Sequence, residues 1–301
     1  MVGSAIWRAL ERKGYSNLVG CSIDELDLTS QADTEVYFKT EKPEYVFLAA
    51  AKVGGIQANN TYRAEFIYQN LAIQTNVIHA SYKYGVKKLL FLGSSCIYPK
   101  ECPQPIKEEY LLTGPLEPTN EPYALAKIAG LKMCESYNKQ YGTEFISVMP
   151  TNLYGPNDNF NLETSHVLPA LMRKFVDAKK QNAPYVSVWG TGKPRREFMH
   201  VDDAADACLF LMNLDFNLYR KLGLSHVNIG TGKDLTISEL AGMIRKIADY
   251  KGDIKCDSSK PDGTMRKLLD VSVLSSLGWT AKVDLREGIR TTLDWYLRTK
   301  R

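Results

Sequence analysis

Tyr123 and Lys127 lie four residues apart in the segment "EPYALAKIAG", so a helix there would place both side chains on one face. An ammonium group held near a phenol favours the phenolate and lowers the tyrosine pKa. Such a tyrosine can exchange a proton with a carbonyl oxygen. A YxxxK spacing also occurs often by chance, so the pair alone does not predict catalysis.

Three polar side chains follow an apolar run about thirty residues upstream. In "KLLFLGSSCIYPK", residues 88–100, Ser94, Ser95 and Cys96 come directly after what is predicted to be a buried strand. A serine at this point could hydrogen-bond the same carbonyl oxygen as the tyrosine. A free cysteine after a buried strand more often packs as a small hydrophobic residue than acts as a base. Ser95, in turn, could simply form a hydrogen bond at the end of the strand. The position of the serines nevertheless favours a catalytic reading of the tyrosine and lysine.

The elements that must position these residues alternate between strands and helices, as in a parallel sheet. Apolar runs without alternation predict strands covered on both faces. The predicted strands are 17–21, 44–51, 88–95 and 144–150. The first predicted helix is 29–43, capped near Thr29 or Ser30 and ended by Pro43. The second is 64–84 and ends at Gly85. The third is 120–141, with Pro122 in its first turn and Gly142 after its end.

This order predicts an α/β fold, a doubly wound parallel-sheet Rossmann domain with a smaller α+β substrate lobe. Such sheets bind ligands at the carboxyl ends of their strands, which would place 52–60, 94–98 and 150–154 along one crevice. The second half has short predicted strands, "YVSVWG", "REFMHV" and "HVNIG", between helices. We expect a dinucleotide-binding domain formed by 1–160 and about 195–232, and a substrate lobe formed by 161–194 and 233–301.

Composition excludes several other classes of protein. The 301 residues are 44% hydrophobic and carry a formal charge of +4 spread along the chain, which argues against nucleic acid as a partner. No apolar stretch reaches the length of a membrane span. The six cysteines form no CxxC pair and no cysteine–histidine cluster with zinc spacing, so we expect reduced thiols, a cytoplasmic location and no metal site.

Several motifs in order resemble the extended short-chain dehydrogenase/reductase superfamily: "GSSCIYP", "EPYALAKIAG", "MPTNLYGP" and "REFMHVDD". With "LAAAKVGGIQANNTY", "SHVLPALMRKF" and "KPDGTMRKLLD", the chain resembles the GDP-L-fucose synthases over nearly its whole length. That resemblance implies an NADP-dependent oxidoreductase with epimerase activity. Such an enzyme epimerises GDP-4-keto-6-deoxy-D-mannose at carbons 3 and 5 and reduces carbon 4 with NADPH.

The resemblance also implies a role for each catalytic residue. Ser94 and Tyr123 would bind the 4-keto oxygen, and Lys127 would hold the nicotinamide ribose while lowering the tyrosine pKa. Cys96 would be the base and His166, in "SHVLP", the acid of the epimerisation. The residues themselves allow simpler interpretations, in which Cys96 belongs to the core and His166 caps a helix. His79, His200 and His226 are expected to be structural.

Further positions follow from the same resemblance. Asn70 is expected to support its helix and the neighbouring segments. The substrate-binding positions are Lys174, Trp189, Arg196 and Asp262; an arginine fork can grip a diphosphate and a tryptophan offers an apolar wall. The cofactor-binding positions are Gly3, Leu92, Gly93, Ser94, Ser95, Lys127, Pro150, Thr151, Asn152, Leu153 and His166. The relatives commonly form a homodimer, for which helices 64–84 and 121–141 are candidates.

Two features depart from the family pattern. Only Met1, Val2 and Gly3 match the end of the Gly-rich loop that holds a pyrophosphate at a helix N-terminus. A first strand of roughly a dozen residues with its turn is therefore expected to be missing from this chain, with weak cofactor binding and marginal stability as the consequence if the chain is complete. Cys21 and Ile23 stand where relatives carry basic residues suited to the 2′-phosphate of NADP.

Two rival functions stay open on the sequence. One is a redox-neutral, NAD-dependent nucleotide-sugar epimerase or dehydratase, against which "GSSCI" argues because a dehydratase would usually show acidic residues beside the serine. The other is a non-catalytic nucleotide-sugar-binding relative, which the incomplete phosphate loop favours. The joint presence of Ser94, Cys96, Tyr123, Lys127 and His166 argues against that second alternative.

Overall fold

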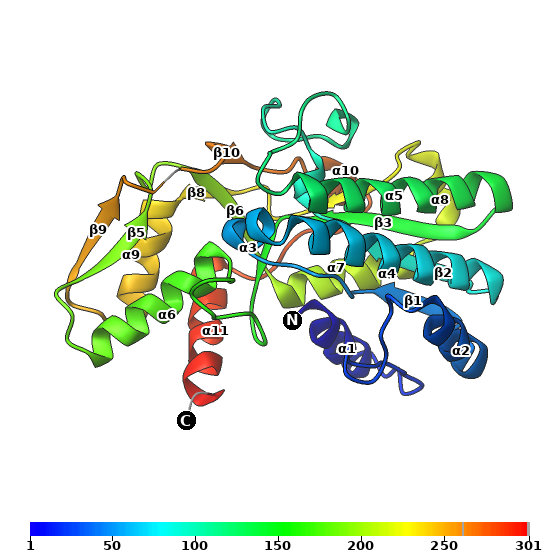
Figure 1. Ribbon diagram of the computed structural model, residues 1–301, viewed down its shortest axis with the longest axis horizontal. Helices are drawn as coiled ribbons and strands as arrows, with labels where there is room; N and C mark the ends of the chain where they lie inside the picture. The colour runs from blue at the N-terminus through cyan, green and yellow to red at the C-terminus, as the bar shows by residue number, and fades with distance from the viewer. Residues whose placement is uncertain (261, 300–301) are drawn as a thin grey trace.

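The computed structural model describes residues 1–260 and 262–299 and shows two unequal parts joined by short strands (Figure 1). The larger part contains a four-stranded parallel sheet with the order β1-β2-β3-β7. Its strands are β1 (Tyr45–Leu48), β2 (Lys88–Leu92), β3 (Glu144–Pro150) and β7 (Val227–Ile229). The predicted parallel α/β fold is confirmed.

Helices cover both faces of this sheet because alternate strand residues point to opposite sides. Leu90 and Leu92 of β2 pack into a core shared with α1 and α7, whereas Leu89 and Phe91 pack into a core shared with α4 and α5. The helices of this part are α1 (Val2–Arg12), α2 (Gln31–Glu41), α4 (Arg63–Lys83), α5 (Glu121–Tyr141), α7 (Val201–Asn213), α8 (Phe216–Lys221) and α10 (Ser272–Ser276).

Helix ends follow the signals in the sequence. The Ser30 side chain accepts a hydrogen bond from the Asp33 N–H at the start of α2. Pro122 lies in the first turn of α5, where its missing N–H removes no helical hydrogen bond. Gly142 ends this helix with φ at +70°, a left-handed conformation that favours glycine. These local signals fix the length of the helix that carries Tyr123.

The predicted strand at 17–21 is wrong. These residues have an irregular backbone and are mostly exposed. A strand needs a neighbour to satisfy its backbone hydrogen bonds, and in the described part of the chain no strand pairs with residues 17–21. The edge of β1 that does not pair with β2 is left without a strand beside it.

The smaller part has its own core, which includes Phe175, Val188, Leu240 and Ile289. Its helices are α6 (Val167–Lys180), α9 (Ile237–Ile247) and α11 (Leu285–Thr299), and its two-stranded sheet pairs β5 (Tyr185–Trp189) with β9 (Asp253–Asp257). A third sheet lies between the parts and contains β4 (Asn152–Tyr154), β6 (Arg195–His200), β8 (Asp234–Thr236) and β10 (Arg266–Lys267). The short elements are α3 (Ile56–Thr61), η1 (Ser95–Ile97) and η2 (Glu108–Tyr110).

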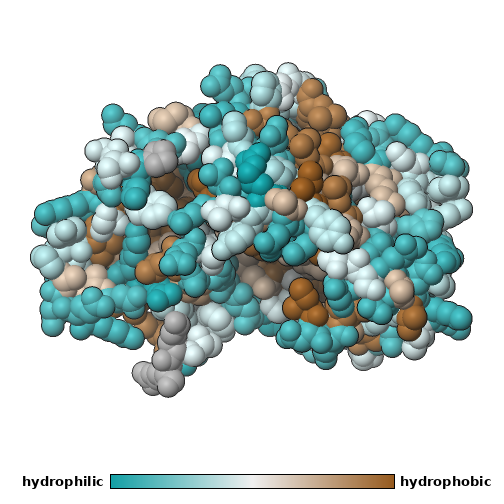
Figure 2. All heavy atoms as spheres, viewed as in Figure 1, coloured by the Kyte–Doolittle hydropathy of each residue, from teal (hydrophilic) through white to brown (hydrophobic). Residues whose placement is uncertain are grey.

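Hydrophilic residues cover most of the visible face, and hydrophobic ones form narrow patches between them (Figure 2). Among the described helices, none combines the length and apolar character that a membrane span requires. The outline is indented between the two parts, where the carboxyl ends of the sheet strands meet the smaller part (Figures 1 and 2).

Candidate active site

The serine, tyrosine and lysine come from two adjacent elements of the larger part. Ser94 follows β2, and Tyr123 and Lys127 lie one turn apart on α5, which packs against β2 and η1. A hydrogen bond joins Ser94 and Tyr123. The Lys127 ammonium donates to the Leu92 carbonyl at 2.8 Å and lies 5.8 Å from the centre of the Tyr123 ring. The structure therefore brings the three residues together at the end of β2.

The pKa of Tyr123 differs from the expectation. Burial raises the pKa of this phenol, the charge of Cys96 raises it further, and the hydrogen bond with Ser94 lowers it in part. Burial also lowers the pKa of Lys127 to about 8. The ammonium is directed at a backbone carbonyl instead of the phenol, so the predicted fall in the tyrosine pKa is wrong for this arrangement. Tyr123 is consequently a protonated donor at neutral pH.

Cys96 lies in the single turn η1 and is partly exposed. Its backbone N–H donates to the Ser94 hydroxyl at 3.3 Å. The Asn120 amide nitrogen lies 3.2 Å from the sulfur and the Lys267 ammonium lies 3.8 Å from it. The interpretation of Cys96 as a core residue is therefore wrong, because the residue is partly exposed and two polar donors approach its sulfur.

His166 is the residue before the first turn of α6, in the smaller part. It is exposed and does not cap the helix with its side chain, so the capping alternative is wrong. The protein around the ring still lowers its pKa by desolvation. The loop before it is fixed to the larger part by a hydrogen bond from the Gly55 N–H to the Thr164 carbonyl at 2.9 Å. Among the described residues, no hydrogen bond or ion pair links His166 to Cys96.

The four predicted substrate positions lie around the smaller part. The Lys174 ammonium donates to the Ser187 carbonyl at 3.0 Å and lies 5.5 Å from the Trp189 ring centre, and that ring is half-exposed. Burial lowers the pKa of Arg196, while the charges of Cys96 and Asp262 raise it. Arg196 thus interacts electrostatically with both Cys96 and Asp262. Asp262 also accepts two hydrogen bonds from Thr191.

The predicted cofactor positions line the ends of β2 and β3. Thr151 and Asn152 both donate through their side chains to the Glu197 carbonyl, which fixes the chain where β3 passes into β4. Ser95 is buried, and an added Cβ at Gly93 would lie 2.2 Å from the Met149 side chain. The remaining positions lie in the same region: Gly3 in the first turn of α1 near Ala49, Leu92 and Pro150 at strand ends, and Leu153 in β4.

The donors present fit the sugar and amide groups of a dinucleotide. Lys127 is buried and makes one hydrogen bond within the described chain, although an ammonium has three donors, so two of its donors remain for a bound group. The amino end of α1 lies near the middle of the molecule (Figure 1), where N–H groups of a first helical turn favour an anion. Cys21 and Ile23 are both exposed and supply no positive charge.

Three residues at the site were not singled out in the sequence. Asn120 and Lys267 donate to Cys96. Glu197 is fully buried and accepts from the N–H groups of Thr231, Gly232 and Leu269. Lys267 lies within the quoted motif "KPDGTMRKLLD", but β10 has two residues and gives no periodic signal. Only the pairing of β10 with β6 reveals the role of this lysine.

The residues expected to be supporting groups behave accordingly. The Asn70 side chain donates to the Lys52 and Phe66 carbonyls and so ties α4 to the loop after β1. His226 is buried beside the Tyr98 hydroxyl, and desolvation lowers its pKa to about 4. His200 precedes α7 and accepts from the Asp202 N–H, and His79 contacts Tyr137.

Comparison with known proteins gives consistent relatives. The model of the NAD dependent epimerase/dehydratase family matches residues 1–230. GDP-L-fucose synthase 1 of Arabidopsis thaliana is 62% identical over 298 residues, covering 99% of this chain and 90% of that protein. GDP-L-fucose synthase of Escherichia coli (strain K12) is 56% identical and covers 100% and 94%. MlghC, a GDP-mannoheptose C4 reductase from Campylobacter jejuni with NADP bound, is 45% identical with a TM-score of 0.90, covering 98% and 95%.

Proposed function

The chain belongs to the NAD dependent epimerase/dehydratase family, and we propose that it is an NADP-dependent GDP-L-fucose synthase. It converts GDP-4-keto-6-deoxy-D-mannose and NADPH to GDP-L-fucose. The observation that carries the proposal is the position of Cys96. It lies two residues after the serine that contacts Tyr123, within reach of an amide donor and an ammonium. A simple ketoreductase needs no such thiol.

The proposed site binds the ketone between Ser94 and Tyr123. Both hydroxyls can donate to the 4-keto oxygen, where negative charge develops both when a neighbouring C–H bond breaks and when hydride is added. Burial keeps Tyr123 protonated, so it can give its proton to that oxygen. NADPH, when bound, supplies the hydride for carbon 4. Lys127 holds its ribose and, being positively charged, favours the tyrosinate left behind.

Epimerisation requires a base on one face of the sugar and an acid on the other. Cys96 as thiolate removes a proton from carbon 3 or carbon 5, and the electron pair moves to the ketone oxygen as an enolate. His166 returns a proton to the opposite face and inverts the carbon. Desolvation lowers the pKa of His166 in the free protein, and the negative charge of a diphosphate bound nearby would raise it.

In the proposal the nucleotide is held by residues of the smaller part and by Arg196 of β6, in the sheet between the two parts. Arg196 and Lys174 supply positive charge for the diphosphate, and the half-exposed Trp189 ring gives the guanine a flat surface. Asp262, with Thr191, completes this side of the site. The proposed division places 1–160 and about 195–232 on the cofactor side and 161–194 and 233–301 on the substrate side. The boundary is crossed by Leu274 and Trp279, which pack into the core of the larger part.

Two further properties belong to the proposal. The exposed side chains of Tyr68 on α4 and Leu125 on α5 favour a homodimer that buries these helices, which light scattering would test. The cytoplasm is the proposed location, in keeping with cysteines that are all unpaired. A monomer at micromolar concentration would contradict the first of these properties.

The test of the proposed activity is NADPH oxidation by the chain with GDP-4-keto-6-deoxy-D-mannose, followed by identification of the product sugar. GDP-L-fucose with one NADPH consumed per sugar is the expected result. Inverted sugar without NADPH consumption would favour the redox-neutral alternative. Nucleotide-sugar binding with neither reaction would favour the non-catalytic one.

A further inference from the structure

We propose that Asn120 and Lys267 are positioning residues that aim the Cys96 sulfur and hold it as a thiolate. This inference rests on the proposed function, because it assigns partners to the base of that reaction. The Asn120 amide nitrogen approaches the sulfur to 3.2 Å and the Lys267 ammonium to 3.8 Å. Asn120 directly precedes α5 and Lys267 lies in β10, about 150 residues further along the chain.

Asn120 is placed by the helix that also carries Tyr123. It is the residue before the first turn of α5, and its carbonyl accepts from the Ala124 N–H at 3.0 Å. Its side chain does not cap the helix, which leaves the amide N–H group directed at Cys96. The buried Oδ1 atom of the same side chain has no hydrogen-bond partner among the described residues. The side chain is therefore ordered by the sulfur and not by the helix end.

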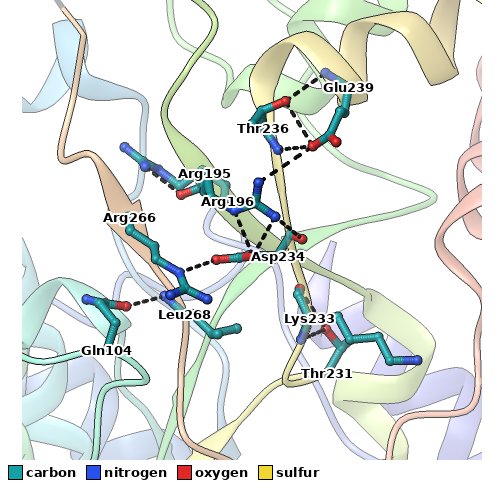
Figure 3. Close-up of polar contacts among 10 residues, drawn as sticks. All are labelled: Gln104, Arg195, Arg196, Thr231, Lys233, Asp234, Thr236, Glu239, Arg266 and Leu268. Carbon is teal, nitrogen blue, oxygen red and sulfur yellow. Dashed lines mark hydrogen bonds and ion pairs between the residues drawn. The ribbon is translucent and has the colours of Figure 1, made fainter.

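Lys267 is placed by the register of β10 on β6. Arg266 pairs with Arg195, and Lys267 pairs with Arg196. Arg195 and Arg266 both bind the Asp234 carboxylate, at 2.9 and 2.6 Å (Figure 3). Because side chains alternate between the two faces of a strand, Lys267 and Arg196 lie on the other face, toward Cys96.

Two further contacts lock that register. The Leu268 N–H donates to the Gln104 side chain at 2.9 Å (Figure 3), and the Ile106 N–H donates back to the Leu268 carbonyl at 2.7 Å. The Leu269 N–H donates to the buried Glu197 carboxylate at 3.0 Å. Gln104 and Ile106 belong to the same loop that begins with Cys96, so the loop and the strand are fixed to each other.

Two positive charges face Cys96, the Lys267 ammonium and the Arg196 guanidinium, and the third titratable group beside it is the neutral Tyr123 phenol. Arg196 shares its charge with Asp262 and donates to the Arg195 and Thr264 carbonyls. Lys267 makes no ion pair with a carboxylate in the described part of the chain. Its charge therefore remains available to the sulfur, since a nearby ammonium stabilises a thiolate.

The test measures thiolate reactivity directly. The full chain is treated with iodoacetamide between pH 6 and 9, and alkylation of Cys96 is followed at the peptide level, since Cys21 and Cys256 are also exposed. We expect Lys267→Met to slow alkylation at pH 7 about tenfold, because the thiolate reacts and its population should fall about tenfold without the nearby ammonium. Lys267→Arg should stay within about threefold of the wild type, and Asn120→Ala should lie between the two.

Lys233→Met is the matched control, because it removes one exposed positive charge that makes no contact with the sulfur among the described residues. Its alkylation rate should equal that of the wild type. An unchanged rate in Lys267→Met, with a native thermal transition, would overturn the inference. A slowed rate in Lys233→Met would also overturn it, because the effect would then be one of net charge.

A second readout uses the reaction. Exchange of sugar protons with deuterated solvent should fall in Lys267→Met at pH 7 and recover as the pH rises, because a higher pH restores the thiolate. Alkylation needs no substrate, so the two proposals fail differently. If Lys267→Met slows alkylation but the wild type forms no GDP-L-fucose, the proposed function alone is overturned. If the wild type forms GDP-L-fucose but Lys267→Met leaves the alkylation rate of Cys96 unchanged, the positioning role alone is overturned.

Discussion

The proposed reducing half of the site, formed by Ser94, Tyr123 and Lys127, differs in construction from the proposed epimerising half, formed by Cys96 and His166. The reducing half comes from β2 and α5, which pack directly against each other. The epimerising half takes one residue from each part of the molecule. Reduction should therefore depend on a single rigid unit, and epimerisation on how the two parts fit together.

The Tyr123→Phe substitution separates the halves most sharply. It removes the proton donor of the reduction, so NADPH oxidation should fall by about 10²- to 10⁴-fold. Ser94 can still stabilise the enolate, so solvent exchange at carbons 3 and 5 should persist at a reduced rate. The assay is NADPH absorbance beside exchange measured by NMR. Wild-type NADPH turnover in this variant would remove Tyr123 from the reaction.

The Cys96→Ser substitution attacks the other half. A serine hydroxyl stays protonated at neutral pH, so exchange at both carbons should fall by about 10²-fold or more. The thermal transition should match the wild type because Cys96 is partly exposed and outside the buried clusters. Mass spectrometry of the sugar in deuterated water measures the exchange. Retained exchange would show that another group acts as the base.

Lys127 links reduction to pH. Its pKa is about 8 in the fold against an ordinary value of 10.5, so its charge is present below pH 8 and is lost above it. The KM for NADPH should therefore rise as the pH passes 8. Between the two pKa values the unfolded chain binds more protons than the folded one, so stability rises with pH. Lys127 should contribute about 2 kcal/mol to the free energy of unfolding between pH 7.5 and 9.5, measured as the difference between the wild type and Lys127→Met. The comparison is needed because the buried thiols of Cys134 and Cys208, whose pKa is raised, lower stability over the same range.

Gly55→Ala should disturb the epimerising half with a smaller effect. An added Cβ would lie 2.7 Å from the Ser165 carbonyl oxygen, next to His166. The loop must shift, at about 1 to 3 kcal/mol of stability. Exchange should slow more than reduction does, because the shift moves His166 relative to Cys96. Equal losses in both activities would show that the two halves are not mechanically separate.

The sequence predicted that Ser94, Tyr123 and Lys127 lie together, because the signals for the elements that carry them are local. The strand 88–95 and the helix with Pro122 and Gly142 have periodic residues and defined ends, and their order in the chain places Ser94 near Tyr123. The phenol pKa was not predictable in the same way. It depends on how much protein surrounds the hydroxyl and on where the Lys127 ammonium is directed, and neither follows from four-residue spacing.

The epimerising half was less accessible to prediction. Cys96 and His166 came from a family resemblance, and the donors to the sulfur were missed. Lys267 reaches Cys96 through a two-residue strand whose register depends on Arg266, Asp234 and Gln104. The strand predicted at 17–21 failed for a related reason, because strand formation depends on a partner that local sequence does not specify.

The measurement that tests the central claim most directly is the isotope pattern of the product. The chain is incubated with GDP-4-keto-6-deoxy-D-mannose and unlabelled NADPH in deuterated water, and the sugar is analysed by NMR. The account predicts GDP-L-fucose with deuterium at carbons 3 and 5 and hydrogen at carbon 4. A reduced sugar with no deuterium at carbons 3 and 5 would contradict it, because Cys96 and His166 would then have no part in the reaction.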